Sequence, residues 1–98
     1  MSASLTAGDR LLFAIHRSDL ADVRAALAAG AGIDDADADD WTPLMHAIRF
    51  ADAPTVKALL AAGARPEIQD GNGWTAFAHA TDGGDPQIIA MLAEKAVA

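Results

Sequence analysis

Two histidines, His46 and His79, are the residues of this sequence best suited to metal binding or proton transfer. They are 33 residues apart, and each follows a Trp-Thr pair at the same distance, so we expect them at equivalent places in two similar units. Packed helices lie about 8–10 Å apart, whereas both ring nitrogens must come within about 2.1 Å of one zinc. Since no third ligand is evident, we interpret both imidazoles as polar groups that line an inner surface or bond to a hairpin. We predict neither a metal nor a cofactor.

A run of acidic residues, DDADADD at positions 34–40, is the next candidate for chemistry. Its alternate carboxylates Asp35, Asp37 and Asp39 have the spacing with which a calcium loop opens. The rest of such a loop is missing, because its sixth residue is not glycine and its twelfth is His46 in place of glutamate. We interpret the run as a solvated acidic hairpin.

Catalytic residues are harder to find. Ser18 lies near His16 and Asp19, which are the residue types of a nucleophile with its base and acid. They fall in an expected turn between helices, where Ser and Asp usually serve as caps. The glycines within residues 71–73 and 83–84 have no following GK[ST], so they do not form a phosphate-binding loop. We predict that the protein is not an enzyme.

The charge balance limits the partners. Fourteen acidic residues against seven basic ones give a net charge of −7, so the average field repels nucleic acid and anionic membrane surfaces. The apolar run at residues 11–15 is too short for a membrane span or a secretory signal. There is no cysteine, which excludes disulfides and thiolate metal sites. We expect an acidic, cytoplasmic protein that binds neither nucleic acid nor membranes.

An internal repeat determines which elements position these residues. The chain aligns with itself at an offset of 33 residues: ALAAGA at 26–31 recurs as LLAAGA at 59–64, and WTPLMHA at 41–47 recurs as WTAFAHA at 74–80. One repeat cannot bury its apolar face alone, so neighbouring repeats must stack on one another. About three repeats are the minimum for a stable stack, and the chain has room for three.

Each repeat is predicted to contain two helices followed by a hairpin. Thr42 and Pro43 suit the N-cap and first position of one helix, which should reach about Phe50. A second helix should begin after Asp52 and end at Gly63, because glycine accepts the left-handed conformation that ends a helix. The apolar spacing places six side chains in the core: Leu44, Val56, Leu59, Leu60, Ile89 and Leu92.

The sequence resembles the ankyrin repeat, whose period is 33 residues and whose best-known segment is a T-P-L-H-x-A box at the start of the first helix. The matching pieces are Thr42-Pro43-Leu44 with Ala47, the segment 56–60, the Gly-Ala pair 63–64 and the hairpin 70–75. The resemblance implies an all-α repeat solenoid, an ankyrin-type helix-turn-helix-hairpin stack of three repeats. We expect a single domain over residues 1–98, with repeats at approximately 9–36, 37–69 and 70–96.

Several residues depart from the family pattern. Met45 and Ala78 replace the box histidine, so the hydrogen bonds that it makes between neighbouring repeats in the family are expected to be absent. Asp40 replaces a hairpin glycine. Pro66 stands where the family favours a β-branched residue, and we expect its hairpin to be irregular.

The two ends of the stack should carry more polar faces. Asp9 and Arg10 stand at the Thr-Pro positions of the first repeat, and Glu94 and Lys95 close the last helix. We therefore expect a complete, capped protein that is a monomer.

The resemblance also implies a groove, built from hairpin tips and inner helices, that binds another protein. Seven residues are assigned to it from their positions at the hairpin base and inner-helix end: Trp41, His46, Arg49, Phe50, Trp74, His79 and Asp82. Aromatic residues are enriched at binding hot spots, but the two tryptophans are equally well interpreted as holding neighbouring hairpins together. Phe50 is either exposed in the groove or buried against the third repeat.

The leading hypothesis is a protein–protein interaction module. Its partner is expected to be basic, because the acidic hairpin would steer a positively charged protein toward it. The alternative is a structural or assembly role, in which terminal repeats stack on other copies or on a larger complex. Exposed apolar surface on an end repeat would favour that alternative.

Overall fold

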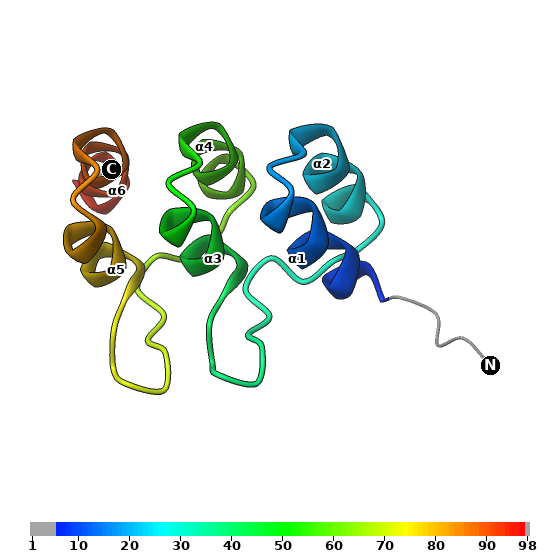
Figure 1. Ribbon diagram of the computed structural model, residues 1–98, viewed down its shortest axis with the longest axis horizontal. Helices are drawn as coiled ribbons and strands as arrows, with labels where there is room; N and C mark the ends of the chain where they lie inside the picture. Colours follow the sequence, from blue (N-terminus) through cyan, green and yellow to red (C-terminus); the bar gives the residue numbers. More distant parts are fainter. Residues whose placement is uncertain (1–5, 98) are drawn as a thin grey trace.

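The computed structural model describes residues 6–97, so residues 1–5 and 98 of the expected domain lie outside the described part of the chain. Within that part the chain forms six helices and no strand (Figure 1). The helices are α1 (Ala7–His16), α2 (Leu20–Ala28), α3 (Pro43–Arg49), α4 (Ala53–Ala61), α5 (Ala76–Gly83) and α6 (Pro86–Val97). The predicted all-helical repeat stack is confirmed.

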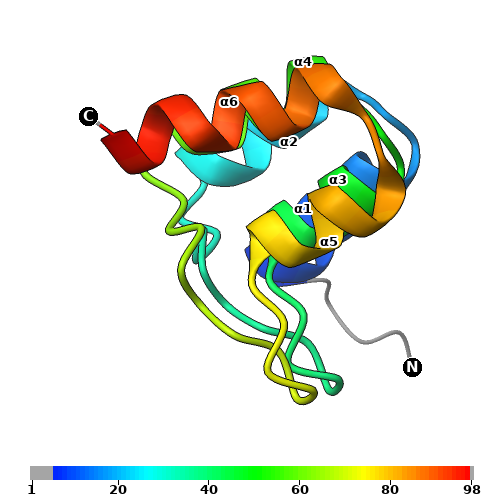
Figure 2. The same cartoon turned by 90° about the vertical axis from the view of Figure 1, so that its left-hand side faces the viewer.

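The helices form two layers. Figure 2 looks along the stack and shows α1, α3 and α5 in one inner layer and α2, α4 and α6 in an outer layer. The two long connections, after α2 and after α4, extend together away from the helices as hairpins. Each inner helix packs on its own outer helix, and α3 also packs on both α1 and α5, so the described residues form an elongated stack of 44 × 27 × 21 Å.

Local chemistry sets the helix starts that the sequence predicts. Thr42 caps α3 by accepting a hydrogen bond from the backbone N–H of Met45, and Pro43 is the first helical residue. Asp52 caps α4 by accepting from the backbone N–H of Thr55. The α3 helix ends one residue before Phe50, which is its C-cap.

The first helix begins three residues before the place that corresponds to the start of α3 in the 33-residue alignment. Its N-cap is Thr6, whereas Asp9 is the residue equivalent to Thr42, and α1 begins at Ala7. The Thr6 hydroxyl accepts from the Asp9 backbone N–H at 3.0 Å, and the Asp9 carboxylate accepts from the Thr6 backbone N–H at 3.2 Å. This reciprocal capping box satisfies two N–H groups that would otherwise lack partners, which is why the helix starts earlier than the repeat alignment predicts.

The core runs along the stack between the two layers. Five of the six predicted core side chains are buried: Leu44, Val56, Leu59, Leu60 and Leu92. Ile89 is only half-buried, and its neighbour Ile88 is fully buried instead. The equivalents of Ile89 in the earlier repeats, Val23 and Val56, are buried. We attribute the difference to the place of Ile89 in the last repeat, where no following repeat covers it within the described chain.

The turn between the paired helices has the same shape in all three repeats. Ser18, Ala51 and Gly84 occupy equivalent positions with φ angles of 54°, 54° and 75°. L-residues other than glycine rarely adopt this left-handed conformation. The turns at Ser18 and Ala51 therefore store backbone strain that Gly84 avoids.

The two hairpins are alike in their hydrogen bonding. Asp37 N–H donates to the Trp41 carbonyl at 3.0 Å, and Asp70 N–H donates to the Trp74 carbonyl at 2.8 Å. The irregularity expected from Pro66 is absent at the second hairpin tip, because Pro66 lies before this bonded segment. Asp40, at the family's glycine position, has a φ of 63°, close to the 82° of the equivalent Gly73. No helix in the described residues has the length and apolarity to cross a membrane.

Candidate partner-binding face

A row of aromatic and imidazole rings crosses all three repeats along the inner helices and hairpin bases. We call it the ring row, and its members in order are Phe50, His16, His46, Trp41, His79 and Trp74. Successive ring centroids are 4.7–5.3 Å apart, and the planes are tilted or edge-to-face. Such contacts stabilise a structure beyond the burial of area alone. Five of the seven predicted groove residues belong to this row.

Trp41 lies between the two equivalent histidines. Its ring centroid is 5.3 Å from that of His46 in its own repeat and 4.7 Å from that of His79 in the next repeat. Trp74, the equivalent tryptophan, has only the His79 ring beside it, at 5.2 Å, and its side chain is 40% exposed. Trp41 is therefore placed to hold two repeats together, whereas Trp74 repeats the same arrangement with one side open.

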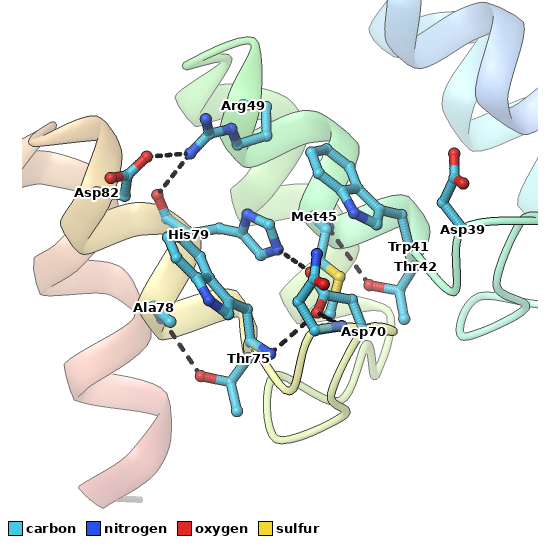
Figure 3. Close-up of polar contacts among 12 residues, drawn as sticks. Asp39, Trp41, Thr42, Met45, Arg49, Asp70, Thr75, Ala78, His79 and Asp82 are labelled. Carbon is cyan, nitrogen blue, oxygen red and sulfur yellow. Dashed lines mark hydrogen bonds and ion pairs between the residues drawn. The ribbon is translucent and has the colours of Figure 1, made fainter.

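Each histidine is oriented by an aspartate of its own hairpin. His46 Nε2 is 2.7 Å from Asp37 Oδ2, and His79 Nε2 is 2.7 Å from Asp70 Oδ2. The other carboxylate oxygen accepts from the hairpin backbone: Asp70 Oδ1 takes the N–H groups of Asn72 and Trp74 at 2.8 and 3.0 Å (Figure 3). The same aspartate thus ties the hairpin to the ring row.

The carboxyls of these two pairs are stabilised in their charged form. Burial raises the pKa of Asp70, but the bonds from the Trp74 backbone, from His79 and from the Asn72 backbone outweigh it, so the pKa lies below the ordinary value. The pKa of Asp37 is lowered for the same balance of reasons. Both carboxylates are therefore ionised at neutral pH.

The remaining nitrogens of the histidines differ. When His46 Nε2 donates its proton to Asp37, Nδ1 is left to accept from His16 Nε2, which is 3.4 Å away in the first repeat. A histidine hydrogen bond thus joins repeats one and two, from residues outside the box position that Met45 and Ala78 occupy. His79 Nδ1 is buried and has no hydrogen-bond partner in the described residues. An Nε2–H tautomer suits His79, because a protonated Nδ1 would leave a donor unpaired.

Arg49 joins the second repeat to the third. Its Nη1 donates to Asp82 Oδ2 at 2.9 Å and to the His79 carbonyl at 3.5 Å (Figure 3). The Arg49 and Asp82 side chains are 38% and 50% exposed, so they reach the surface as a neutral pair. Phe50 is 51% exposed, with its edge-to-face contact on the His16 ring 5.0 Å away. It is therefore not buried against the third repeat.

An open cleft lies between the tips of the two hairpins. Six residues line it, with a volume of about 470 Å³, and we call it the hairpin cleft: Ala38, Asp39, Asp40, Trp41, Gly71 and Asn72. Within the described residues, the carboxylates of Asp39 and Asp40 have no hydrogen-bonding or ion-pair partner, and both residues are exposed. Asp39 projects on the same side of the hairpin as the Trp41 ring (Figure 3). Two carboxylates without partners, on a cleft that Trp41 also lines, suit a cationic side chain.

The acidic run at residues 34–40 therefore divides into two kinds of residue. Asp37 accepts three hydrogen bonds within its hairpin and with His46. Asp34 accepts from the backbone N–H of Arg65 at 3.0 Å and so links the first hairpin to the second. These two aspartates stabilise the hairpins through hydrogen bonds, whereas the exposed aspartates of the run present their negative charge to solvent.

Part of this face was not predicted from the sequence. His16 was expected only in a turn between helices, Asp37 in a solvated acidic run, and Asp70 had no expected role beyond its hairpin. The aspartates had a detectable signal, because each precedes a histidine by nine residues in two successive repeats. His16 had none, because its equivalents at 49 and 82 are an arginine and an aspartate. A shared metal site between His46 and His79 is excluded sterically, since the Trp41 ring lies between them. No group of three potential metal ligands occurs within residues 6–97.

Comparison with known proteins agrees with the repeat architecture. A family model described as ankyrin repeats, in three copies, matches residues 11–98. No curated protein sequence matches the chain.

Proposed function

The chain belongs to the ankyrin-repeat family, and we propose that it binds a basic protein partner along the ring row, with the hairpin cleft as the centre of the contact. Ankyrin repeats generally act as protein–protein interaction modules and are typically non-enzymatic. We infer the binding face from the location of the exposed aromatic rings and unpaired carboxylates. A cytoplasmic location remains part of the proposal.

The hairpin cleft is the observation that supports this proposal best. A lysine or arginine of the partner would enter the cleft beside the Trp41 ring and contact Asp39 and Asp40. The net charge of −7 would steer such a partner toward the protein. Because both hairpins line the cleft, a ligand there would contact two repeats at once.

The other predicted residues would surround that centre. Phe50 and Trp74 expose aromatic surface toward the two ends of the ring row. Arg49 and Asp82 offer polar groups whose charges already neutralise each other, so we expect them to add hydrogen bonds more than steering. The side chain of His79 is 4% exposed, and we assign it and His46 the role of positioning the tryptophans from beneath.

Selection of peptides from a random display library against the purified protein tests the proposal. We expect the selected sequences to be rich in lysine and arginine. The variant Asp39→Asn/Asp40→Asn should weaken binding of a selected peptide by about tenfold or more, because charge-assisted bonds each contribute about 1.5–3 kcal/mol. The matched control Asp35→Asn/Glu94→Gln removes the same charge at positions outside the cleft and should change affinity by less than about threefold.

Two results would overturn the proposal. Selected peptides without basic residues would exclude a cationic ligand in the cleft. An equal loss of affinity in the cleft variant and in the control variant would show that only the overall charge matters, and that the hairpin cleft is not the contact.

A further inference from the structure

The last repeat leaves an apolar position uncovered that the earlier repeats bury. Leu11 and Leu44 are 0% and 1% exposed at equivalent positions of α1 and α3, whereas Phe77 of α5 is 46% exposed. In the first two repeats the following inner helix packs on the helix that carries this position, α3 on α1 and α5 on α3. In the third repeat a large aromatic side chain stands there with no cover within the described chain.

Two further residues share this property. Ile89 is half-buried where Val23 and Val56 are fully buried, and Trp74 lacks the second ring that Trp41 finds in the next repeat. We call Trp74, Phe77 and Ile89 the tail face. It continues the surface that joins one repeat to the next.

A neighbouring position of the last repeat is polar. Thr81 is exposed where Ile15 and Ile48 are buried, so part of the last repeat is polar as an end repeat should be. The predicted capping is therefore partial. The exposed apolar surface of the three tail-face residues does not favour solubility, so it needs another explanation.

The opposite end of the stack offers a matching surface. Phe13 of α1, equivalent to His46 and His79, is 51% exposed, and His16 and Arg10 beside it in the same helix are also exposed. We call Arg10, Phe13 and His16 the head face, of which the His16 ring also contacts His46 and Phe50 of the second repeat. Figure 1 shows that α1 and α5 lie at opposite ends of the molecule, so both faces can be occupied at once.

We propose that the tail face binds the head face of a second copy of this chain, so that protomers associate head to tail. The register of the repeats specifies the contacts. Trp41 meets His79 and Arg49 meets Asp82 across the joint between repeats two and three. If the first repeat of a second copy took the place of a fourth repeat, each pair would recur one repeat later. Trp74 would then contact Phe13 of the second copy, which is equivalent to His79, and Asp82 would contact His16 of the second copy, which is equivalent to Asp82 itself.

Both new pairs are chemically complementary. Trp74 and Phe13 extend the ring row by an aromatic contact, and Asp82 pairs with an imidazole. Within residues 6–28 the bases Arg10, Arg17 and Arg24 are balanced by Asp9, Asp19 and Asp22, whereas residues 76–97 carry Asp82, Asp85 and Glu94 against Lys95. The first-repeat end is therefore neutral on balance, so it does not repel the acidic last repeat even though the whole chain is acidic.

The association is expected to be weak. Arg10 and Asp22 stand where Pro43 and Thr55 are buried between repeats, so the joint between copies must desolvate two charged groups. The protein would then be a monomer when dilute, as the sequence analysis expects, and would assemble when concentrated. A head-to-tail contact does not close on itself, so the assembly should grow beyond a dimer.

Sedimentation equilibrium at rising concentration tests the proposal with two variants. Phe77→Gln alters the tail face and Phe13→Gln alters the head face, and both side chains are half-exposed, so thermal melts should confirm that each variant still folds. We expect the wild type to exceed the 10.1 kDa chain mass progressively. Each variant alone should associate at least about tenfold more weakly.

The decisive arm mixes the variants. Phe77→Gln keeps an intact head and Phe13→Gln an intact tail, so an equal mixture should restore association, with heterodimers as the largest abundant species. A wild type that stays monomeric up to about 1 mM would overturn the proposal. Self-association of Phe13→Gln at wild-type strength would overturn it in favour of a tail-to-tail dimer, and failure of the mixture to associate would also exclude head-to-tail contact.

Discussion

Replacing each tryptophan by alanine should have unequal effects on stability. Trp41 contacts two rings, His46 and His79, that belong to different repeats, whereas Trp74 contacts His79 alone and is 40% exposed. Each ring pair contributes about 0.5–1.5 kcal/mol beyond area burial. Trp41→Ala therefore loses about 2 kcal/mol from its pairs and about 1 kcal/mol more from the half-buried surface. Trp74→Ala loses about 1 kcal/mol from its single pair and about 1 kcal/mol from its own partly buried surface.

Urea unfolding followed by circular dichroism at the helical band measures this difference without relying on tryptophan fluorescence. With a typical urea dependence for a domain of this size, the difference of about 1 kcal/mol between the variants separates their midpoints by about 0.5–1 M. Trp41→Phe is the control, because it keeps a ring between the histidines and should recover more than half of the loss. Equal costs for Trp41→Ala and Trp74→Ala would refute the assignment of Trp41 as the ring that joins the repeats.

Three other predictions concern stability and binding kinetics. Stability should fall as the pH drops below about 4, because the pKa values of Asp37 and Asp70 are lower in the folded than in the unfolded chain and their contribution is lost on protonation; pH-dependent urea titrations should show a weaker fall for Asp70→Asn. Ala51→Gly should raise the free energy of unfolding by about 0.5–1 kcal/mol, and Gly84→Ala should lower it by about 1 kcal/mol, because both positions have positive φ angles. Opposite signs in calorimetry would contradict the turn geometry. Association with a selected basic peptide should slow as salt rises, and stopped-flow measurements on Asp39→Asn/Asp40→Asn should show a weaker salt dependence; an unchanged dependence would mean that these carboxylates do not steer the ligand.

The repeat framework was predictable because its signals are local and recur. Thr42, Pro43 and Asp52 mark helix starts by chemistry that involves only neighbouring residues, and their positions were predicted correctly. The first helix shows the limit of relying on the alignment alone. Thr6 and Asp9 have the spacing of a capping box, and this local signal prevailed over the 33-residue register.

The roles within the binding face depended on tertiary structure. Whether Trp41 binds a ligand or joins repeats depends on where His79 lies, 38 residues later in the chain. The exposure of Ile89 and Phe77 depends on whether another repeat follows, which no local pattern specifies. His16 enters the ring row only through contacts with the next repeat.

The central claim is that a basic protein segment binds between the hairpin tips and along the ring row. Nuclear magnetic resonance of the ¹⁵N-labelled protein, titrated with a selected basic peptide, tests it most directly because each backbone amide and indole N–H reports on its own surroundings. We expect the largest shifts on the Trp41 indole and on the amides of residues 38–41 and 71–72. Shifts confined to the outer helices α2, α4 and α6 would contradict it.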